Sequence, residues 1–538
     1  MSAQLQWQNA TIPSMLEDAV RKYGEREAIS QTGTKISYAE LFGMVCAFAD
    51  LLLSLNVKRG DKVGIWLPNY HEWIVANLAI ASIGAITVPI NTRFRSIEAK
   101  YVLHASGISV LVTTDHFMTN HYLDMLEGIA PECKGVGDKP IASAALPALR
   151  HVLGVRTEDA RTLPLSCVLG PPTTPSRELK ARMAGTRAED PVNMFWTSGT
   201  TGNPKGALCP HRVLENVWHY GRIMDYNAED RCLAPLPFFY TTANYWVMLC
   251  ALMHGACIVP LMEFTAEEAL ETIDREKITV TVGIPNTFIG YLRSPVFDKY
   301  SMKSLRRIWT GGATTPIELA RSLVEKLGLE FLCQVYGMTE TGGITMITPP
   351  AAPLEKAVAS VGRPLPNFDL RLIDRQTGQE VGPGVDGELW VKTPYNLVSY
   401  YGMSAEESKN YFTDDGWYKT GDVMRRDEED NYFFRGRIKD MIKVAGENVA
   451  AREVENAIFS HPAIVQVAVV GIPDPLRNEA IVAFVETRQE TSEAELIAFC
   501  KERLAPFKVP KRFMFRSEWP ITATGKIQKF LLVEELTK

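Results

Sequence analysis

The stretch Phe195-Trp196-Thr197-Ser198-Gly199-Thr200-Thr201-Gly202-Asn203-Pro204-Lys205-Gly206 is the most informative part of the sequence for fold and function. The apolar run 192–196 predicts a strand before it, and a helix is expected to begin near His211. Its glycines let backbone N–H groups approach phosphate oxygens, and Lys205 adds a positive charge. It is not a Walker A loop, because no Gly-Lys-Ser/Thr follows the first glycine at the required spacing. The stretch therefore predicts a phosphate-binding loop between a strand and a helix.

Helix and strand patterns alternate on both sides of this loop. Residues 37–53 carry apolar side chains at helical spacing, whereas residues 62–67, 109–113 and 278–283 are short apolar runs typical of buried strands. Alternation of this kind predicts an α/β fold.

The chain has 538 residues, which is too long for one hydrophobic core and predicts two or three domains. Beyond residue 437 the pattern tightens: a helix is expected at 451–459 and two strands at 465–471 and 480–485. Ser492 and Glu495 have the spacing of a capping box at the start of a further helix. We therefore expect a large domain of residues 1–437 and a small α+β domain of residues 438–538.

Composition argues against several classes of protein. With 57 Lys and Arg against 63 Asp and Glu, the net charge of −6 argues against a nucleic-acid-binding surface. The nine cysteines include no Cys-x-x-Cys and predict reduced thiols rather than a zinc site. The most apolar stretches, 75–90 and 245–262, are interrupted by Gly and Pro and predict a buried helix leading into a strand rather than a membrane span. Because no signal peptide is evident, a cytoplasmic protein is expected.

The loop sequence TSGTTGNPKG resembles the phosphate-loop signature of the adenylate-forming superfamily, which includes acyl-CoA synthetases, adenylation domains of peptide synthetases and beetle luciferases. The resemblance extends from Ser37-Tyr38-Ala39-Glu40-Leu41 to Thr524-Gly525-Lys526-Ile527, with several motifs in the family's order. It implies an N-terminal AMP-binding domain and a mobile C-terminal domain. The loop residues that it assigns to ATP are Thr197, Ser198, Gly199, Thr200, Thr201, Gly202 and Lys205.

Gln334-Val335-Tyr336-Gly337-Met338-Thr339-Glu340-Thr341 is similar to the family's nucleotide motif. The resemblance implies that Gln334, Tyr336 and Gly337 contact the nucleotide, with adenine stacked on the aromatic ring. It also implies catalytic roles for Thr339 at the α-phosphate and for Glu340, a hard oxygen ligand for Mg²⁺.

Gly311-Gly312-Ala313-Thr314-Thr315-Pro316 follows an expected strand at 307–309. In similar proteins this turn lies along adenine and forms one wall of the acid pocket, so small residues are needed. The opposite wall is expected after Leu236-Pro237-Phe238, where the family commonly has a histidine and this chain has Tyr240. The predicted adenine contacts are Gly312, Ala313 and Thr314, and the predicted acid pocket is Phe239, Tyr240, Thr241, Asn244, Gly311 and Gly312.

Trp417-Tyr418-Lys419-Thr420-Gly421-Asp422 resembles the family's ribose motif, in which the carboxylate of Asp422 accepts hydrogen bonds from the ribose hydroxyls. Arg437 corresponds to the family's second ribose or phosphate contact, and Lys439 lies where the family's two domains pivot. Within the next motif, Lys443, Gly446, Glu447 and Asn448 are expected to face the site during thiol transfer. Lys526 matches the family's catalytic lysine, whose charge stabilises the carboxylate's attack on phosphate.

Together the motifs predict an ATP-dependent acid:thiol ligase that uses Mg²⁺ and coenzyme A. It would form an acyl-AMP and pyrophosphate, and after a domain rotation it would form an acyl-CoA thioester. Three alternatives stay open: a carrier-protein thiol as acceptor, a luciferase-type oxygenase, and a non-catalytic AMP sensor, against which Lys526 and Glu340 argue. A homodimer is also left open. The sequence leaves the acid open among aromatic, alicyclic, branched and medium-chain acids.

Overall fold

The computed structural model describes residues 7, 9–134, 139–164, 173–197, 204–312, 315–438, 441–444, 447–474, 478–521 and 527–537. The chain divides into two units. The predicted boundary between residues 437 and 438 lies within the second unit and stays a prediction. The first unit comprises Met1–Val358, Pro364–Phe368 and Thr393–Asn410, and the second comprises Ala359–Arg363, Asp369–Lys392 and Tyr411–Lys538.

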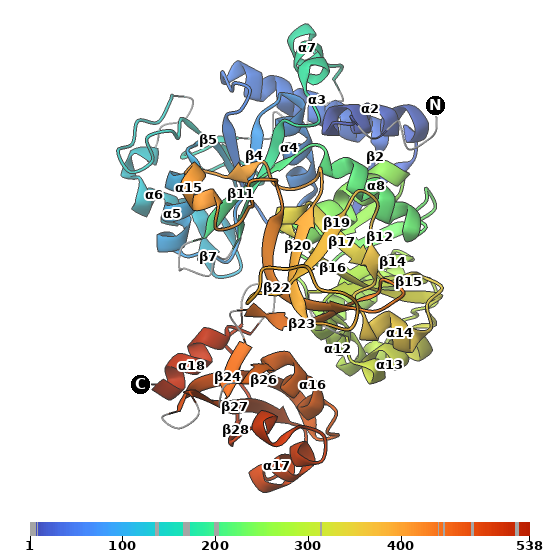
Figure 1. The fold of residues 1–538 in the computed structure, drawn as a ribbon. Helices are drawn as coiled ribbons and strands as arrows, with labels where there is room; N and C mark the ends of the chain where they lie inside the picture. Colours follow the sequence, from blue (N-terminus) through green and yellow to red (C-terminus); the bar gives the residue numbers. More distant parts are fainter. Residues whose placement is uncertain are drawn as a thin grey trace. The chain divides into compact units, whose positions relative to one another are not determined.

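A mostly parallel sheet organises one half of the first unit, with strands in the order β17-β16-β15-β14-β12-β13-β1-β2 (Figure 1). Neighbours from β16 to β1 are parallel, whereas β17 and β2 run antiparallel to β16 and β1. Every residue of β13, β14 and β15 is buried, as expected for parallel strands covered on both faces. The bounds are β1 (Glu27–Gln31), β2 (Thr34–Ser37), β12 (Arg231–Ala234), β13 (Cys257–Pro260), β14 (Val280–Gly283), β15 (Arg307–Gly311), β16 (Phe331–Met338) and β17 (Gly343–Ile347).

A second sheet of the same unit has the order β21-β11-β10-β4-β3-β5-β8-β9. Its strands β10 and β11 form an antiparallel pair on either side of the glycine-rich loop, and the strands from β10 to β9 are parallel. The bounds are β3 (Lys62–Trp66), β4 (Ile86–Pro89), β5 (Ile108–Thr113), β8 (His151–Gly154), β9 (Leu163–Pro164), β10 (Pro191–Thr197), β11 (Lys205–Pro210) and β21 (Ser399–Tyr400).

Two helices lie between these sheets. The helix α3 (Tyr38–Ser54) contacts β1 and β2, α4 (His71–Ser82) contacts β3 and β4, and the two helices contact each other. Ser37 caps α3 in a capping box with Glu40. The helix α4 is buried along its whole length between helix and sheet neighbours, and apolar residues therefore predominate on all of its faces.

The other helices surround the sheets (Figure 1). Both long apolar stretches fold as predicted, since α4 leads into β4, and η3 and α10 lead into β13. Among the described residues, no helix is long and apolar enough to cross a membrane. The remaining helices of the first unit include α2 (Ile12–Tyr23), α5 (Ser96–Ser106), α6 (Tyr122–Ile129), α7 (Arg177–Gly185), α8 (Val213–Ile223), α9 (Thr241–Ala243), the π-helix η3 (Asn244–Leu249), α10 (Cys250–His254), α11 (Ala266–Arg275), α12 (Pro285–Arg293), α13 (Ile317–Leu327), the 3₁₀ helix η5 (Thr339–Thr341) and α15 (Ala405–Ser408).

The second unit contains two antiparallel-rich sheets. One has the order β19-β20-β22-β23, and the other has the order β25-β24-β27-β26 with β28 parallel to β27. An apolar core joins the second of these sheets to α16 and α17. The bounds are β19 (Asp369–Ile373), β20 (Gly387–Lys392), β22 (Tyr418–Arg426), β23 (Tyr432–Arg437), β24 (Met441–Val444), β25 (Glu447–Ala450), α16 (Ala451–Phe459), β26 (Ile464–Asp474), β27 (Asn478–Thr487), α17 (Glu493–Lys501), β28 (Arg512–Phe515) and α18 (Lys529–Thr537).

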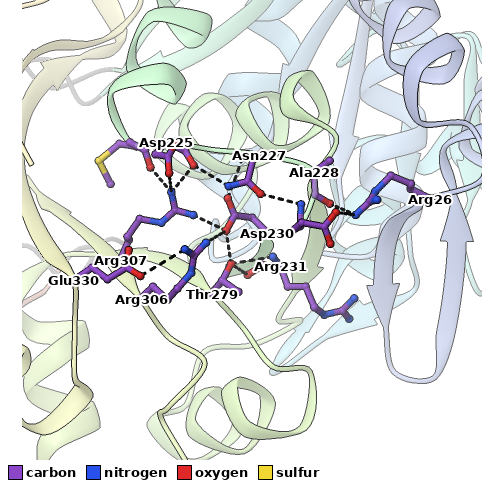
Figure 2. Close-up of polar contacts among 12 residues, drawn as sticks. Arg26, Asp225, Asn227, Ala228, Asp230, Arg231, Thr279, Arg306, Arg307 and Glu330 are labelled. Carbon is purple, nitrogen blue, oxygen red and sulfur yellow. Dashed lines mark hydrogen bonds and ion pairs between the residues drawn. The ribbon is translucent and has the colours of Figure 1, made fainter.

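A buried ion pair joins the amino ends of three strands of the first sheet (Figure 2). Arg307, the first residue of β15, donates to the carboxylate of Asp230, which directly precedes β12. Both side chains are fully buried. The Thr279 hydroxyl, just before β14, donates to the same carboxylate at 2.7 Å. The carboxylate of Asp230 thus holds three strand ends in register.

Several hydrogen bonds support this pair (Figure 2), although Nε of Arg307 has no partner among the described residues. Asp230 also accepts from the Asn227 backbone N–H at 3.0 Å and from Arg306 at 3.1 Å. Arg307 donates to the Met224 carbonyl at 2.6 Å and to that of Asp225. A buried ion pair needs such bonds, because desolvation otherwise exceeds the attraction between the charges.

We expect Arg307→Ala to lower the free energy of unfolding by about 3–5 kcal/mol, because the buried carboxylate of Asp230 would lose its fully buried partner and keep Arg306, which is partly exposed, as its remaining cation. Urea unfolding followed by tryptophan fluorescence measures this loss. Arg321→Ala is the control, because its pair with Glu318 lies on the exposed side of α13 and should contribute about 1 kcal/mol or less. Equal loss in both variants would contradict the role given to the buried pair.

Candidate active site

The glycine-rich loop connects β10 to β11, so that its first and last described residues face each other. Thr197 pairs with Lys205, and Trp196 pairs with Gly206. The strand before the loop was predicted, but the strand after it was not, and the expected helix begins only at Val213. The predicted ATP contacts Ser198, Gly199, Thr200, Thr201 and Gly202 lie outside the described residues.

His211 anchors the chain just beyond β11. Its Nδ1 accepts a hydrogen bond from the Ile12 backbone N–H at 3.1 Å. Burial lowers the pKa of His211 to about 3. The ring is therefore neutral near pH 7, which its acceptor role requires.

A close backbone approach shapes the nucleotide motif at the end of β16. Gly337 pairs with Ile344, and Met338 pairs with Gly343, on β17. A Cβ at Gly337 would lie 1.9 Å from the Gly343 carbonyl oxygen. Only glycine fits there without moving backbone, so the motif's glycine has a structural reason as well as its predicted nucleotide contact.

Gln334 connects this motif to the predicted adenine turn. Its side-chain Oε1 accepts from the Thr315 backbone N–H at 3.3 Å, and its own backbone N–H donates to the Thr348 hydroxyl at 2.8 Å. Gln334 is buried on β16 beside β15. The carboxyl ends of these two parallel strands therefore bring the turn and the nucleotide motif together.

The predicted catalytic pair Thr339 and Glu340 lies on η5, directly after β16. The Thr339 and Thr241 hydroxyl oxygens are 3.2 Å apart. The Tyr400 hydroxyl donates to Oε1 of Glu340 at 3.0 Å. Thr339 thus lies against the predicted acid segment, and Glu340 lies against β21, which pairs with β11.

The predicted acid segment forms α9 and the start of the π-helix. Tyr240 accepts a hydrogen bond on its phenol oxygen from Asn91 at 3.3 Å, and burial raises the pKa of this phenol to about 12. It is therefore neutral, and its ring packs on Phe239 with centroids 4.5 Å apart. Asn244 is fully buried, and neither of its amide atoms has a hydrogen-bond partner in the part of the chain that the structure describes.

Trp246 belongs to this site but was not predicted. Its ring lies 3.4 Å from where a Cβ of Gly311 would stand, and its Nε1 lies 3.3 Å from the same position on Gly343. The residue lies in the π-helix η3, whose wider turn changes the direction of each side chain. Helical spacing in the sequence gives no signal of such a turn.

The predicted glycine wall is present at the end of β15. A Cβ on Gly311 would approach Val335 Cγ2 to 2.7 Å, and Gly312 has a φ of +72°, which favours glycine. Ala313 and Thr314 lie outside the described residues.

In the second unit, the predicted ribose residues face each other on neighbouring strands. Asp422 pairs with Arg437 in the register of β22 and β23, and Arg437 Nε lies 3.0 Å from Asp422 Oδ1. Asp422 is almost fully buried, whereas the Arg437 side chain is half-exposed. The register of the two strands thus brings together the two residues that the resemblance assigns to ribose.

The predicted thiol-transfer motif forms the hairpin of β24 and β25. Lys443 pairs with Asn448, Glu447 pairs with Val444, and the Lys443 backbone N–H donates to Glu479 Oε2 at 2.6 Å. Gly446, the predicted hinge residue Lys439 and the predicted catalytic residue Lys526 lie outside the described residues.

Comparisons with known proteins agree with these motifs. The sequence pattern of the family described as AMP-binding enzyme matches residues 16–401, and that of the AMP-binding enzyme C-terminal domain matches residues 453–526. This chain belongs to the AMP-binding enzyme family.

Relatives in this family include the mitochondrial medium-chain acyl-CoA ligase ACSF2 of Mus musculus, which is 33% identical over 98% of this chain and 88% of its own length. The structure of the anthranilate CoA ligase AuaEII in complex with anthranoyl-AMP matches with a TM-score of 0.87 at 25% identity, covering 99% of each chain. ATP-bound MatB from Rhodopseudomonas palustris matches with a TM-score of 0.85 at 26% identity, covering 98% of this chain and 99% of that one.

These likenesses confirm the predicted adenylate-forming superfamily and its acyl-CoA synthetase branch. They confirm the α/β fold with a large N-terminal AMP-binding domain and a small C-terminal domain. The chain is an ATP-dependent, AMP-forming acyl-CoA ligase, as predicted, and a carrier-protein acceptor is not favoured.

For this ligase we expect Gly337→Ala to lower the free energy of unfolding by about 1–3 kcal/mol, because the new methyl group would force β16 and β17 apart. ATP affinity should fall as well, since Thr339 and Glu340 follow directly. Gly128→Ala is the control, because nothing lies within 4 Å of its Cβ position. Thermal unfolding and equilibrium ATP binding measure both effects, and wild-type values for Gly337→Ala would refute the argument.

Proposed function

We propose that this ligase activates a medium-chain carboxylic acid with MgATP and transfers the acyl group to coenzyme A. The observation that carries the proposal is the 3.2 Å approach of the Thr241 and Thr339 hydroxyls. It joins the predicted acid segment to the nucleotide motif, so a carboxylate and an α-phosphate could bind side by side. Proximity of this kind accounts for much of the rate enhancement in two-substrate reactions.

In the first half-reaction, a carboxylate oxygen attacks the α-phosphorus, and the bond to the β-phosphate oxygen breaks to release pyrophosphate. Two anions approach each other in this step, so donors and cations lower the barrier. We assign this role to the Thr339 hydroxyl and to Lys526. Ribose is assigned to Asp422, a buried carboxylate that faces Arg437 on the neighbouring strand.

In the second half-reaction, the coenzyme A thiolate attacks the acyl carbonyl carbon, and AMP leaves with the electrons of the mixed-anhydride bond. We assign a pivot at Lys439 and a thiol-facing loop that includes Lys443, Gly446, Glu447 and Asn448. The hydrogen bond from the Lys443 backbone N–H to the Glu479 carboxylate holds the β24–β25 hairpin to β27, so the hairpin would move together with β27. A small domain that begins at residue 438 is part of the same proposal.

Magnesium fits Glu340. Within the described residues, no group of three or more His, Cys, Asp and Glu is placed to hold a metal ion. Mg²⁺ commonly binds through one or two carboxylates together with the phosphates of its nucleotide, so a single glutamate suffices. When bound, Mg²⁺ would neutralise phosphate charge. The Glu340 side chain is held at one oxygen by Tyr400, which leaves the other for a ligand.

A medium-chain acid is favoured by the named activity of the mouse relative and by the side chains of the predicted acid segment. Phe239 and Trp246 are apolar and buried, and Tyr240 is neutral. A pocket of this kind binds an alkyl chain through burial of apolar surface. Because Trp246 lies over Gly311, its ring would limit the length of the chain. The cytoplasmic location, a carrier-protein partner and a homodimer stay predictions.

An acid library measures the proposed reaction directly. We expect pyrophosphate release and acyl-CoA formation to have their highest kcat/KM with medium-chain acids, compared with short, long and aromatic acids. Lys526→Ala should reduce pyrophosphate release by more than about 100-fold while preserving thioester formation from preformed acyl-AMP. A preference for aromatic acids would refute the proposed acid, and wild-type pyrophosphate release by Lys526→Ala would refute the role of that lysine.

Trp246→Ala should shift the preference toward longer acids, because removing the ring lengthens the pocket beside Gly311. One methylene in such a pocket changes kcat/KM by about 10–200-fold, so a clear change in rank order is expected. Tyr245→Phe is the matched control on the same π-helix, because it removes only the hydroxyl that donates to Asn193 at 3.1 Å and keeps the ring that lies 3.7 Å from the Cβ position of Gly343. An unchanged rank order in Trp246→Ala would place the end of the pocket elsewhere.

A further inference from the structure

The short strand β21 connects two parts of the active site that are distant in sequence. Its flanking residue Val398 donates its backbone N–H to the Leu208 carbonyl at 2.7 Å, and Tyr401 donates to that of Gly206, also at 2.7 Å. Both acceptors lie on β11, the strand that follows the glycine-rich loop. The backbone on both sides of Tyr400 is therefore held against the loop's second strand.

The same segment also holds Glu340. The Leu397 backbone N–H donates to the Glu340 carbonyl oxygen at 2.9 Å. The Tyr400 hydroxyl donates to Glu340 Oε1 at 3.0 Å, and Tyr400 is only 6% exposed. A hydrogen bond to a carboxylate that is shielded from water is stronger than one between neutral groups.

The other oxygen of this carboxylate is available for a ligand. Oε2 of Glu340 accepts no hydrogen bond from the residues that the structure describes. One donor on one oxygen restrains a carboxylate while leaving lone pairs on the second oxygen. Metal ligands in proteins are commonly oriented by hydrogen bonds of this kind.

The ring of Tyr400 has a separate contact. Lys205 Nζ lies 5.8 Å from its centroid, within the range of a weak cation–π interaction. The hydroxyl therefore acts on Glu340 and the ring on Lys205. This division makes the two contacts separable by mutation.

We propose that Tyr400 is a positioning residue whose hydroxyl orients Glu340 for the magnesium ion of MgATP and whose ring positions Lys205 for the phosphates. The proposal rests on the proposed function, because that assigns magnesium to Glu340. It accounts for a buried tyrosine whose hydroxyl donates to the carboxylate of Glu340.

The test uses Mn²⁺ as a spectroscopic substitute for Mg²⁺ and α,β-methylene ATP as a nucleotide that does not react. Electron paramagnetic resonance of free Mn²⁺ gives its Kd in the enzyme–nucleotide complex. Tyr400→Phe removes only the hydroxyl, and we expect it to weaken Mn²⁺ binding about 10-fold. Tyr401→Phe removes the neighbouring hydroxyl, whose ring is 38% exposed and contacts Lys62, and it should leave the Mn²⁺ Kd unchanged.

Tyr400→Leu separates the role of the ring. Calorimetry with EDTA present measures nucleotide binding without metal. We expect Tyr400→Leu to weaken this binding about 2–5-fold, whereas Tyr400→Phe should match the wild type because its ring remains over Lys205. Thermal unfolding of each variant identifies a loss of folding.

An unchanged Mn²⁺ Kd in a folded Tyr400→Phe would overturn the proposal, as would equal weakening by Tyr401→Phe. If all three variants bind the nucleotide without metal as tightly as the wild type does, the role of the ring is overturned. None of these measurements needs an acid or coenzyme A. A wild type that binds Mn²⁺ and the nucleotide but ligates no acid would therefore refute the proposed function and leave the role of Tyr400 standing.

Discussion

The buried pair of Asp230 and Arg307 is the interaction on which the first sheet depends. It joins the amino ends of β12, β14 and β15, while the predicted site residues lie at the opposite ends of the strands or just after them. In a parallel sheet, the carboxyl ends of neighbouring strands share one edge, and loops from that edge form the ligand site. A shift in register at the buried pair would therefore displace the turn after β15 relative to Gln334 on β16. The hydrogen bond from the Thr315 backbone N–H to the Gln334 side chain joins that turn to β16.

At the edge of the sheet where the predicted site lies, close contacts between neutral groups determine the geometry of the site. The Thr241 and Thr339 hydroxyls approach to 3.2 Å, and the Gly337 and Gly343 backbones approach so closely that no side chain fits at Gly337. Burial keeps Tyr240 and His211 uncharged at neutral pH. The formal charges at Lys205 and Glu340 both lie against Tyr400, so one side chain links the loop to the nucleotide motif.

Local patterns predicted many elements with accurate bounds. The helix expected at 451–459 is α16 (Ala451–Phe459), and the one expected at 37–53 is α3 (Tyr38–Ser54), because an amphipathic face and a cap are short-range signals. The strand β11 was missed because it is defined by its pairing with β10, which lies across the loop. The π-helix was missed for a related reason, since the insertion of one residue into a helical turn is stabilised by packing and leaves no periodic pattern.

The sequence by itself determined the family, the reaction class and the residue types at the site, because phosphate binding, magnesium and adenylate chemistry require particular groups at particular spacings. The contacts were decided by the tertiary structure. Trp246 meets Gly311 from a segment more than sixty residues earlier in the chain, and Tyr400 meets Glu340 from sixty residues later. Such pairs depend on strand order and register, which are set by long-range packing and not by local spacing.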